Sequence, residues 1–112
     1  MIKLLIVVKR NPSLSLDQFR EHLSTQHARL IRACPATHKY LRKYVQSYSL
    51  PVGFGDQEAP FDGAAELYFD DVGGMNAFFS DPDYLESVRP DEARFADVER
   101  CVFYVTSEQQ II

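Results

Sequence analysis

The 112-residue sequence has no tryptophan, only two cysteines (Cys34 and Cys101) and no long hydrophobic run. Two cysteines are too few for the disulfide framework of a small secreted domain. The longest apolar stretch, residues 4–8, is far shorter than the roughly 20 residues that a membrane-spanning helix needs. The first residues lack the pattern of a secretory signal, so we expect a cytoplasmic protein with no membrane partner.

Signatures of cofactors, metals and nucleic acids are also missing. The chain has no cluster of thiolates, and no helix start follows Gly53 and Gly55 to form a phosphate-binding loop. His22 and His27 would lie about 140° apart around a regular α-helix, so we do not expect them to form a metal-binding pair. A formal net charge of −4 argues against binding to nucleic acid. The sequence therefore predicts no cofactor, no metal and no nucleic-acid partner.

The length and composition fit one globular domain spanning residues 1–112, with 46% hydrophobic and 25% charged residues. Charge is distributed unevenly along this domain. Residues 1–43 hold nine of the twelve Lys and Arg, whereas residues 44–112 hold fourteen of the sixteen Asp and Glu. This asymmetry indicates either an anion-binding site in the basic part or basic elements packed against acidic ones.

Hydrophobic periodicity predicts four strands, at residues 2–9, 39–48, 61–70 and 101–106. It also predicts helices at residues 16–33, 72–80 and about 90–98, with a turn after Asp81-Pro82. Ser15 and Gln18 match a capping box, and Pro35 should end the first helix. Residues 49–60 should form a loop, which is long for a connection between two strands and could cover another part of the molecule.

This order of elements, β-α-β-β-α-β, is typical of an α+β, ferredoxin-like fold with a four-stranded antiparallel sheet and both helices on one face. The uncovered face of the sheet would still carry many apolar and aromatic side chains. An apolar face of this size favours a partner, and two such sheets could cover each other. We therefore expect a homodimer.

His27 is the first candidate for a functional residue. Its spacing from Leu23, Leu30 and Ile31 places it on the buried stripe of the first helix, which faces the sheet. A titratable ring at that position is either a core histidine with satisfied hydrogen bonds or an acid–base group in a pocket.

Polar rows on two predicted strands form the second candidate. Asp62, Glu66 and Tyr68 alternate along one strand, and another strand carries a row that includes Arg42 and Tyr44. Together these strands could line a small-molecule cavity with carboxylates and phenols. The alternative is a solvated sheet face held by cross-strand pairs such as Arg42 with Glu66.

Asp91 is the third candidate, because it shares a predicted helical face with Phe95 and Val98. A carboxylate on an apolar face needs a partner, and His27, Arg94 or a tyrosine could supply it. The alternative is an acidic residue that interacts with the helix dipole.

Several blocks of the sequence resemble the EthD family. The opening block is Lys9-Arg10, then Ser15 to Arg20, then His27-Ala28. The other blocks are Tyr44-Val45-Gln46, residues 61–69 and residues 91–97. The resemblance spans nearly the whole chain, in order, and it implies a dimeric α+β barrel, as in polyketide cyclases, muconolactone isomerase and cofactor-free monooxygenases.

From these residues we expect a cofactor-independent lyase or isomerase acting on a small aromatic or polyketide-like molecule. His27 would move a proton, and Asp62, Glu66 or Asp91 would orient it or act as the partner acid. Tyr44 and Tyr68 would hold a substrate oxygen, with Arg42 and Phe95 at the same substrate site. The alternatives are a non-catalytic binding protein of a degradation or biosynthetic pathway, a cofactor-free monooxygenase, and a structural dimer without a site.

Overall fold

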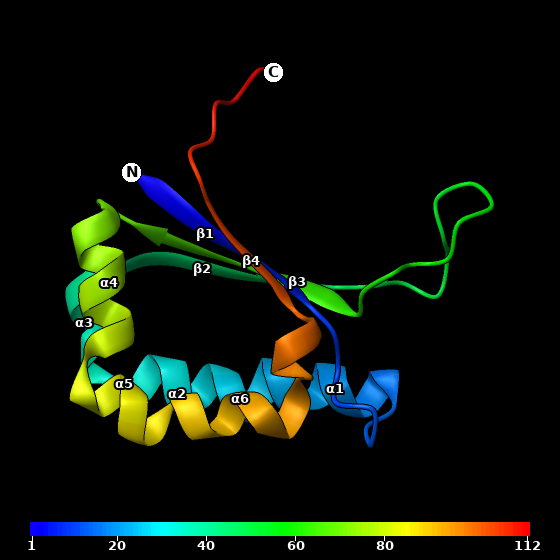
Figure 1. Cartoon of the computed structure of the whole chain (residues 1–112), viewed down its shortest axis with the longest axis horizontal. Coiled ribbons are helices and arrows are strands. Elements are labelled where there is room, and N and C mark those ends of the chain that lie inside the picture. The colour runs from blue at the N-terminus through cyan, green and yellow to red at the C-terminus, as the bar shows by residue number, and fades with distance from the viewer.

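The computed structural model describes all of residues 1–112, and its strands and helices follow the predicted order. Four strands form one antiparallel sheet in the order β2-β3-β1-β4, and the helices cover one of its faces (Figure 1). The strands are β1 (Ile2–Val8), β2 (Leu41–Tyr48), β3 (Gly63–Phe69) and β4 (Val102–Thr106). This is the ferredoxin-like α+β fold that the sequence predicts, with β1 as a central strand.

The predicted first helix forms as three consecutive segments, α1 (Leu16–His22), the π-helical turn η1 (Leu23–His27) and α2 (Ala28–Ala33). The capping box is confirmed: the Gln18 amide donates to Ser15 Oγ at 3.1 Å, and the Ser15 amide donates to Gln18 Oε1 at 2.9 Å. The π-turn is a feature that the apolar pattern did not predict, and it lies at the candidate histidine.

Pro35 ends the first helix as predicted, but it also opens a further helix, α3 (Pro35–Tyr40). Proline suits the first helical position because its missing N–H would have no partner there. The second strand therefore begins at Leu41, and the prediction of a strand from residue 39 was wrong at its start. The remaining helices are α4 (Val72–Ser80), α5 (Pro82–Ser87), α6 (Arg89–Phe95) and the short 3-10 turn η2 (Val98–Arg100).

Two apolar clusters fill the space between the sheet and the helices. The larger includes Phe69, Phe78 and Tyr84, where α4 and α5 meet the sheet. The smaller includes Phe19, Leu23 and Phe95, where α1 and α6 lie under the sheet. The opposite face of the sheet carries no helix, and the C-terminal tail leaves on that side (Figure 1). None of the helices combines the length and apolar character needed to cross a membrane.

Gly63 allows β3 to approach its neighbours closely. A Cβ added at this position would lie 2.7 Å from the Ser47 carbonyl oxygen and 3.3 Å from the Phe19 ring. The backbone oxygen cannot move without breaking the register between β2 and β3. Gly63 thus marks a close approach between backbones, which is a common reason for a glycine inside a strand.

We predict that Gly63→Ala lowers the free energy of unfolding by about 1–3 kcal/mol, because it overpacks the site. Gly74→Ala in α4 is the matched control, since its added Cβ would lie at an ordinary contact distance of 3.5 Å from Oδ1 of Asp71, the residue that caps the helix. That change should stabilise the protein by about 0.5–1 kcal/mol, because alanine is the better helix former. Urea unfolding measures both, and equal effects of the two changes would contradict the close-approach argument.

Candidate active site

His27 ends the π-turn η1 and points from the helix layer toward the sheet. His27 is only 5% exposed, although both nitrogens of a histidine ring are polar. The ring packs on Phe95 of α6 with ring centroids 4.6 Å apart. Leu23, at the start of the same turn, is also buried. The π-turn thus places an imidazole inside the smaller apolar cluster.

Asp91 lies in the first turn of α6 and is 1% exposed, so its carboxylate is buried. His27 Nδ1 lies 3.0 Å from Asp91 Oδ2. His22 Nε2 lies 2.9 Å from Oδ1 and 3.0 Å from Oδ2 of the same carboxylate. Arg94 adds a longer contact of 3.4 Å to Oδ1. We call His22, His27 and Asp91 the His–Asp–His cluster.

The charge states of this cluster follow from burial and hydrogen bonding. Burial alone would raise the pKa of Asp91, but the hydrogen bonds from His22 and His27 hold that pKa below its ordinary value. Burial also lowers the pKa of His27, and the Asp91 carboxylate only partly opposes this effect. At neutral pH we therefore assign an ionised Asp91 beside a neutral His27.

The tautomer of His27 is fixed by its partner. An ionised carboxylate can only accept hydrogen bonds, so the Nδ1 atom of His27 carries the proton. Nε2 is then the unprotonated nitrogen, and it makes no hydrogen bond to the protein. Every side-chain nitrogen or oxygen that is shut off from solvent has a partner. Nε2 is therefore open to a small molecule.

A cavity of about 60 Å³ lies next to His27, between the helix layer and the sheet. Ten of its twelve lining residues are hydrophobic, which suits the apolar part of a small molecule. The lining residues are Ile6, Val8, Leu23, His27, Tyr44, Ala65, Glu92, Phe95, Ala96, Val98, Cys101 and Phe103. His27, Tyr44 and Phe95 are therefore brought together as the sequence predicts, and Asp91 joins them through its contact with His27.

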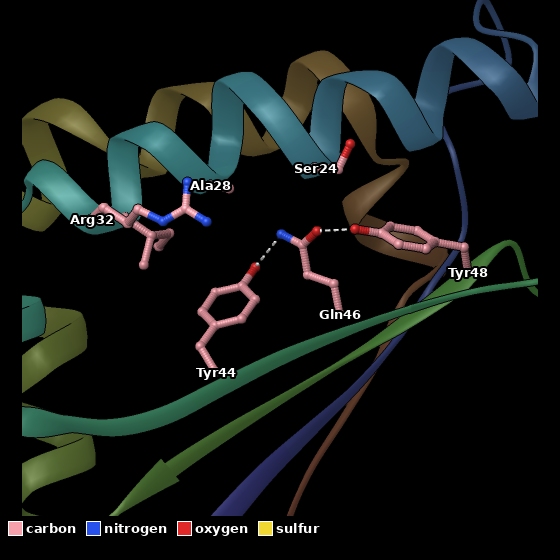
Figure 2. Close-up of a pocket in the computed structure, with 7 residues that line it drawn as sticks. Ser24, Ala28, Arg32, Tyr44, Gln46 and Tyr48 are labelled. Atoms are coloured by element: carbon pink, nitrogen blue, oxygen red, sulfur yellow. Dashed lines mark hydrogen bonds between the residues drawn. The ribbon is translucent and has the colours of Figure 1, made fainter.

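Tyr44 belongs to a row of hydrogen-bonded side chains on β2 (Figure 2). Tyr48 donates its hydroxyl proton to Gln46 Oε1, and Gln46 Nε2 donates to the Tyr44 hydroxyl at 3.3 Å and to the Leu23 carbonyl at 2.9 Å. Burial raises the pKa of Tyr44 to about 12, so its hydroxyl stays protonated. The Tyr44 hydroxyl accepts from Gln46 and keeps its own proton free for another acceptor.

The prediction that both polar rows line one cavity was wrong. In the strand register, Glu66 lies opposite Val45 and Tyr68 lies opposite Lys43. The Glu66 carboxylate and the Tyr68 phenol therefore lie on the face of the sheet that carries no helix. Tyr44 pairs with Leu67 and lies on the opposite face. Cross-strand partners share a face, so the register separates Tyr44 from the two other predicted residues.

Two further predicted site residues bind other parts of the protein. Asp62 accepts from the Arg10 backbone amide at 2.8 Å and from Arg10 Nε at 3.2 Å, which ties the end of β1 to the loop before β3. Arg42 is displaced from the Tyr44 row by a bulge in β2 and pairs with Asp70 at 2.9 Å, not with Glu66. Neither side chain lines the cavity.

Two residues of the site, His22 and Glu92, were not predicted from the sequence. His22 was set aside because a regular helix would separate it from His27, and only the π-turn brings both to Asp91. Glu92 lines the cavity, binds the Tyr84 hydroxyl, and has a pKa that burial raises. Its position next to Asp91 in the sequence was the only available signal. No group of three His, Cys, Asp or Glu side chains has the arrangement of a metal site.

Comparisons with known proteins identify the EthD domain and relatives of the same fold. A profile of the EthD domain matches residues 11–99. The chain is 25% identical over 121 residues to the dehydratase aurZ of Gibberella zeae, covering all of this chain and 80% of that protein. A crystal structure of an EthD family protein from Bacillus halodurans is 25% identical with a TM-score of 0.72, over 97% of this chain and 100% of that one.

A third relative adds information on the fold. A ferredoxin-like protein of unknown function from Thermobifida fusca, described as dimeric, is 19% identical with a TM-score of 0.66. The match covers 96% of this chain and 90% of that one. At this identity the likeness supports the fold alone.

We predict that the His27 ring titrates below the ordinary value of 6.5, because burial disfavours its charged form. Asp91→Asn should lower the midpoint further, since the carboxylate is what favours the imidazolium. The proton NMR shifts of the ring, followed against pH, measure both midpoints.

The control variant is Asp83→Asn, which removes a carboxylate that is exposed on α5. It should leave the His27 midpoint unchanged. A wild-type midpoint at or above 6.5, or a rise in the Asp91→Asn protein, would contradict the assigned charge states.

Proposed function

The chain belongs to the EthD family, and we propose that it is a cofactor-independent lyase or isomerase that moves a proton on a small aromatic or polyketide-like molecule. The observation that carries this proposal is the neutral, buried His27. Its Nδ1 atom is held by Asp91, and its Nε2 atom is open beside an apolar cavity. A positioned imidazole with one free nitrogen is the usual general base of proteins.

Dehydration of a β-hydroxy ketone shows how these groups could act. His27 Nε2 would take the proton from the carbon next to the carbonyl group. The electrons of the C–H bond would form the new C=C bond as the C–O bond to the hydroxyl group breaks. The leaving hydroxyl would then take the proton back from the imidazolium and depart as water, which regenerates neutral His27.

Asp91 and Tyr44 would stabilise charge during this reaction. The Asp91 carboxylate faces the Nδ1–H group, so it favours the imidazolium that forms when Nε2 gains a proton. The free Tyr44 hydroxyl could donate to the substrate carbonyl, where negative charge develops. The dehydratase of Gibberella zeae, at 25% identity, supports this reaction class without identifying the substrate.

We predict that His27→Gln lowers kcat by about 10²–10⁴-fold, which is the usual contribution of general acid–base catalysis. Purified protein is incubated with a panel of β-hydroxy ketones that bear phenol rings, and mass spectrometry detects the loss of one water. His38→Gln is the matched control, because His38 is exposed and does not line the cavity.

Circular dichroism and thermal unfolding check that both variants remain folded. Full turnover by folded His27→Gln protein would exclude His27 as the base. Saturable binding without product from any member of the panel would indicate a binding protein instead of an enzyme.

We also propose that the protein is a homodimer that covers the open face of the sheet. Val102 and Tyr104 of the edge strand β4 are 43% and 46% exposed, and their partners Val7 and Leu5 place them on this face. The face continues through Val45 of β2. These exposed apolar side chains lie beside the ionic network of Glu66 and Tyr68, a mixture that a second copy could cover, and the Thermobifida fusca relative is described as dimeric.

Sedimentation at micromolar concentration should therefore give twice the chain mass of 12.9 kDa. Val102→Asp should shift the protein toward the monomer, because it would bury a charge in the interface. Val72→Asp is the control, since Val72 is 49% exposed but lies on α4 in the helix layer. A monomeric wild type would contradict the proposal.

A further inference from the structure

An open groove of about 300 Å³ adjoins the buried cavity, between the helical segments η1 and α2 and the edge strand β2 (Figure 2). Its lining residues are Ser24, Ala28, Ile31, Arg32, Tyr44, Gln46 and Tyr48. Tyr44 lines both the groove and the cavity. A molecule whose reacting carbon meets His27 could therefore extend past the Tyr44 hydroxyl into the groove.

Arg32 is the one charged side chain of the groove, and no carboxylate lines it. Four other arginines pair with carboxylates: Arg10 with Asp62, Arg42 with Asp70, Arg89 with Glu92 and Arg94 with Asp91. The guanidinium of Arg32 forms no ion pair. It reaches from α2 into the space above Tyr44 (Figure 2).

The neutral side chains of the groove also leave one hydrogen-bond donor free. The acceptor oxygen of Gln46 is occupied by the Tyr48 hydroxyl, and its nitrogen is occupied by Leu23 and Tyr44. The hydroxyl proton of Tyr44 is left without an acceptor. At the far end, the Arg20 guanidinium stacks over the Tyr48 ring at 4.8 Å. The groove is thus positively charged and has aromatic walls.

A guanidinium presents its N–H groups in a fixed planar fork that matches the two oxygens of a carboxylate. The distribution of charge and donors therefore selects a ligand with an acidic end and a flat body. We propose that the groove binds the carboxylate of a planar aromatic or polyketide-like acid, with Arg32 as the residue that recognises it. This proposal rests on the proposed function, because it assigns the substrate of the same site.

The test compares two bicyclic probes of nearly the same shape, a charged hydroxynaphthoate and the matching neutral hydroxynaphthamide. Calorimetry measures their affinities for the wild type, Arg32→Gln and the control Arg29→Gln. Arg29 lies on the same helix and is exposed, but it does not line the groove. The control therefore removes the same charge nearby without touching the site.

We expect the wild type to bind the acid about tenfold more tightly than the amide, because a charge-assisted pair near solvent is partly screened. Arg32→Gln should remove this preference and leave the affinity for the amide unchanged. Arg29→Gln should keep the preference. Raising the salt concentration should weaken binding of the acid alone.

Equal affinity of the wild type for both probes, or a preference that survives in Arg32→Gln, would overturn the carboxylate assignment. If binding of both probes nevertheless depends on His27, tested with His27→Gln, the proposed function stands while this inference fails. If neither probe binds the wild type, the inference is overturned, and the dehydration assay decides separately on the proposed function.

Discussion

The buried carboxylate of Asp91 is the group on which the arrangement of the candidate site depends. An ionised carboxylate that is removed from water costs several kcal/mol unless hydrogen-bond donors replace the water. Here His22 and His27 supply those donors from the first helix, while Asp91 itself belongs to α6. The carboxylate therefore holds two helices together, and the same contact fixes which nitrogen of His27 faces the cavity.

The π-turn makes this arrangement possible. In a regular α-helix, residues five apart lie about 140° from one another around the axis, so only one of the two histidines could reach Asp91. The wider turn from Leu23 to His27 brings both rings to one carboxylate. Gln46 of β2 donates to the Leu23 carbonyl and so supports the turn from the side of the sheet. Turns of this kind often occur at functional sites.

The fold could be predicted from the sequence because its signals are local. The capping box at Ser15, the proline at residue 35 and the alternation in β3 each follow from the conformational preferences of a few neighbouring residues. The choice of His27 and Asp91 also rested on local periodicity. The partnership of His22 with Asp91 was not predictable in this way, because the buried positions keep a regular four-residue spacing through the π-turn, from Phe19 to Ile31.

The pairing register between the strands was also not predictable from the sequence. Which rows of β2 and β3 share a face depends on long-range pairing and on the bulge at Arg42, and neither has a clear local signal. For this reason Tyr44 was placed correctly beside His27, whereas Glu66 and Tyr68 were assigned to the wrong face. In the structure they form an ionic network with Lys3 and Glu108.

Each of the two interpretations of the uneven charge distribution applies to some of the basic residues. Lys3, Arg10 and Arg42 each pair with a carboxylate from the acidic part, so much of the asymmetry reflects basic elements packed against acidic ones. The arginines of the first helix are different. Arg20, Arg29 and Arg32 form no ion pair; Arg32 lines the groove beside Tyr44, and Arg20 stacks over the ring of Tyr48. Of these three, Arg32 places its unpaired charge in the groove that adjoins the His27 cavity, where it would attract an acidic substrate toward the base.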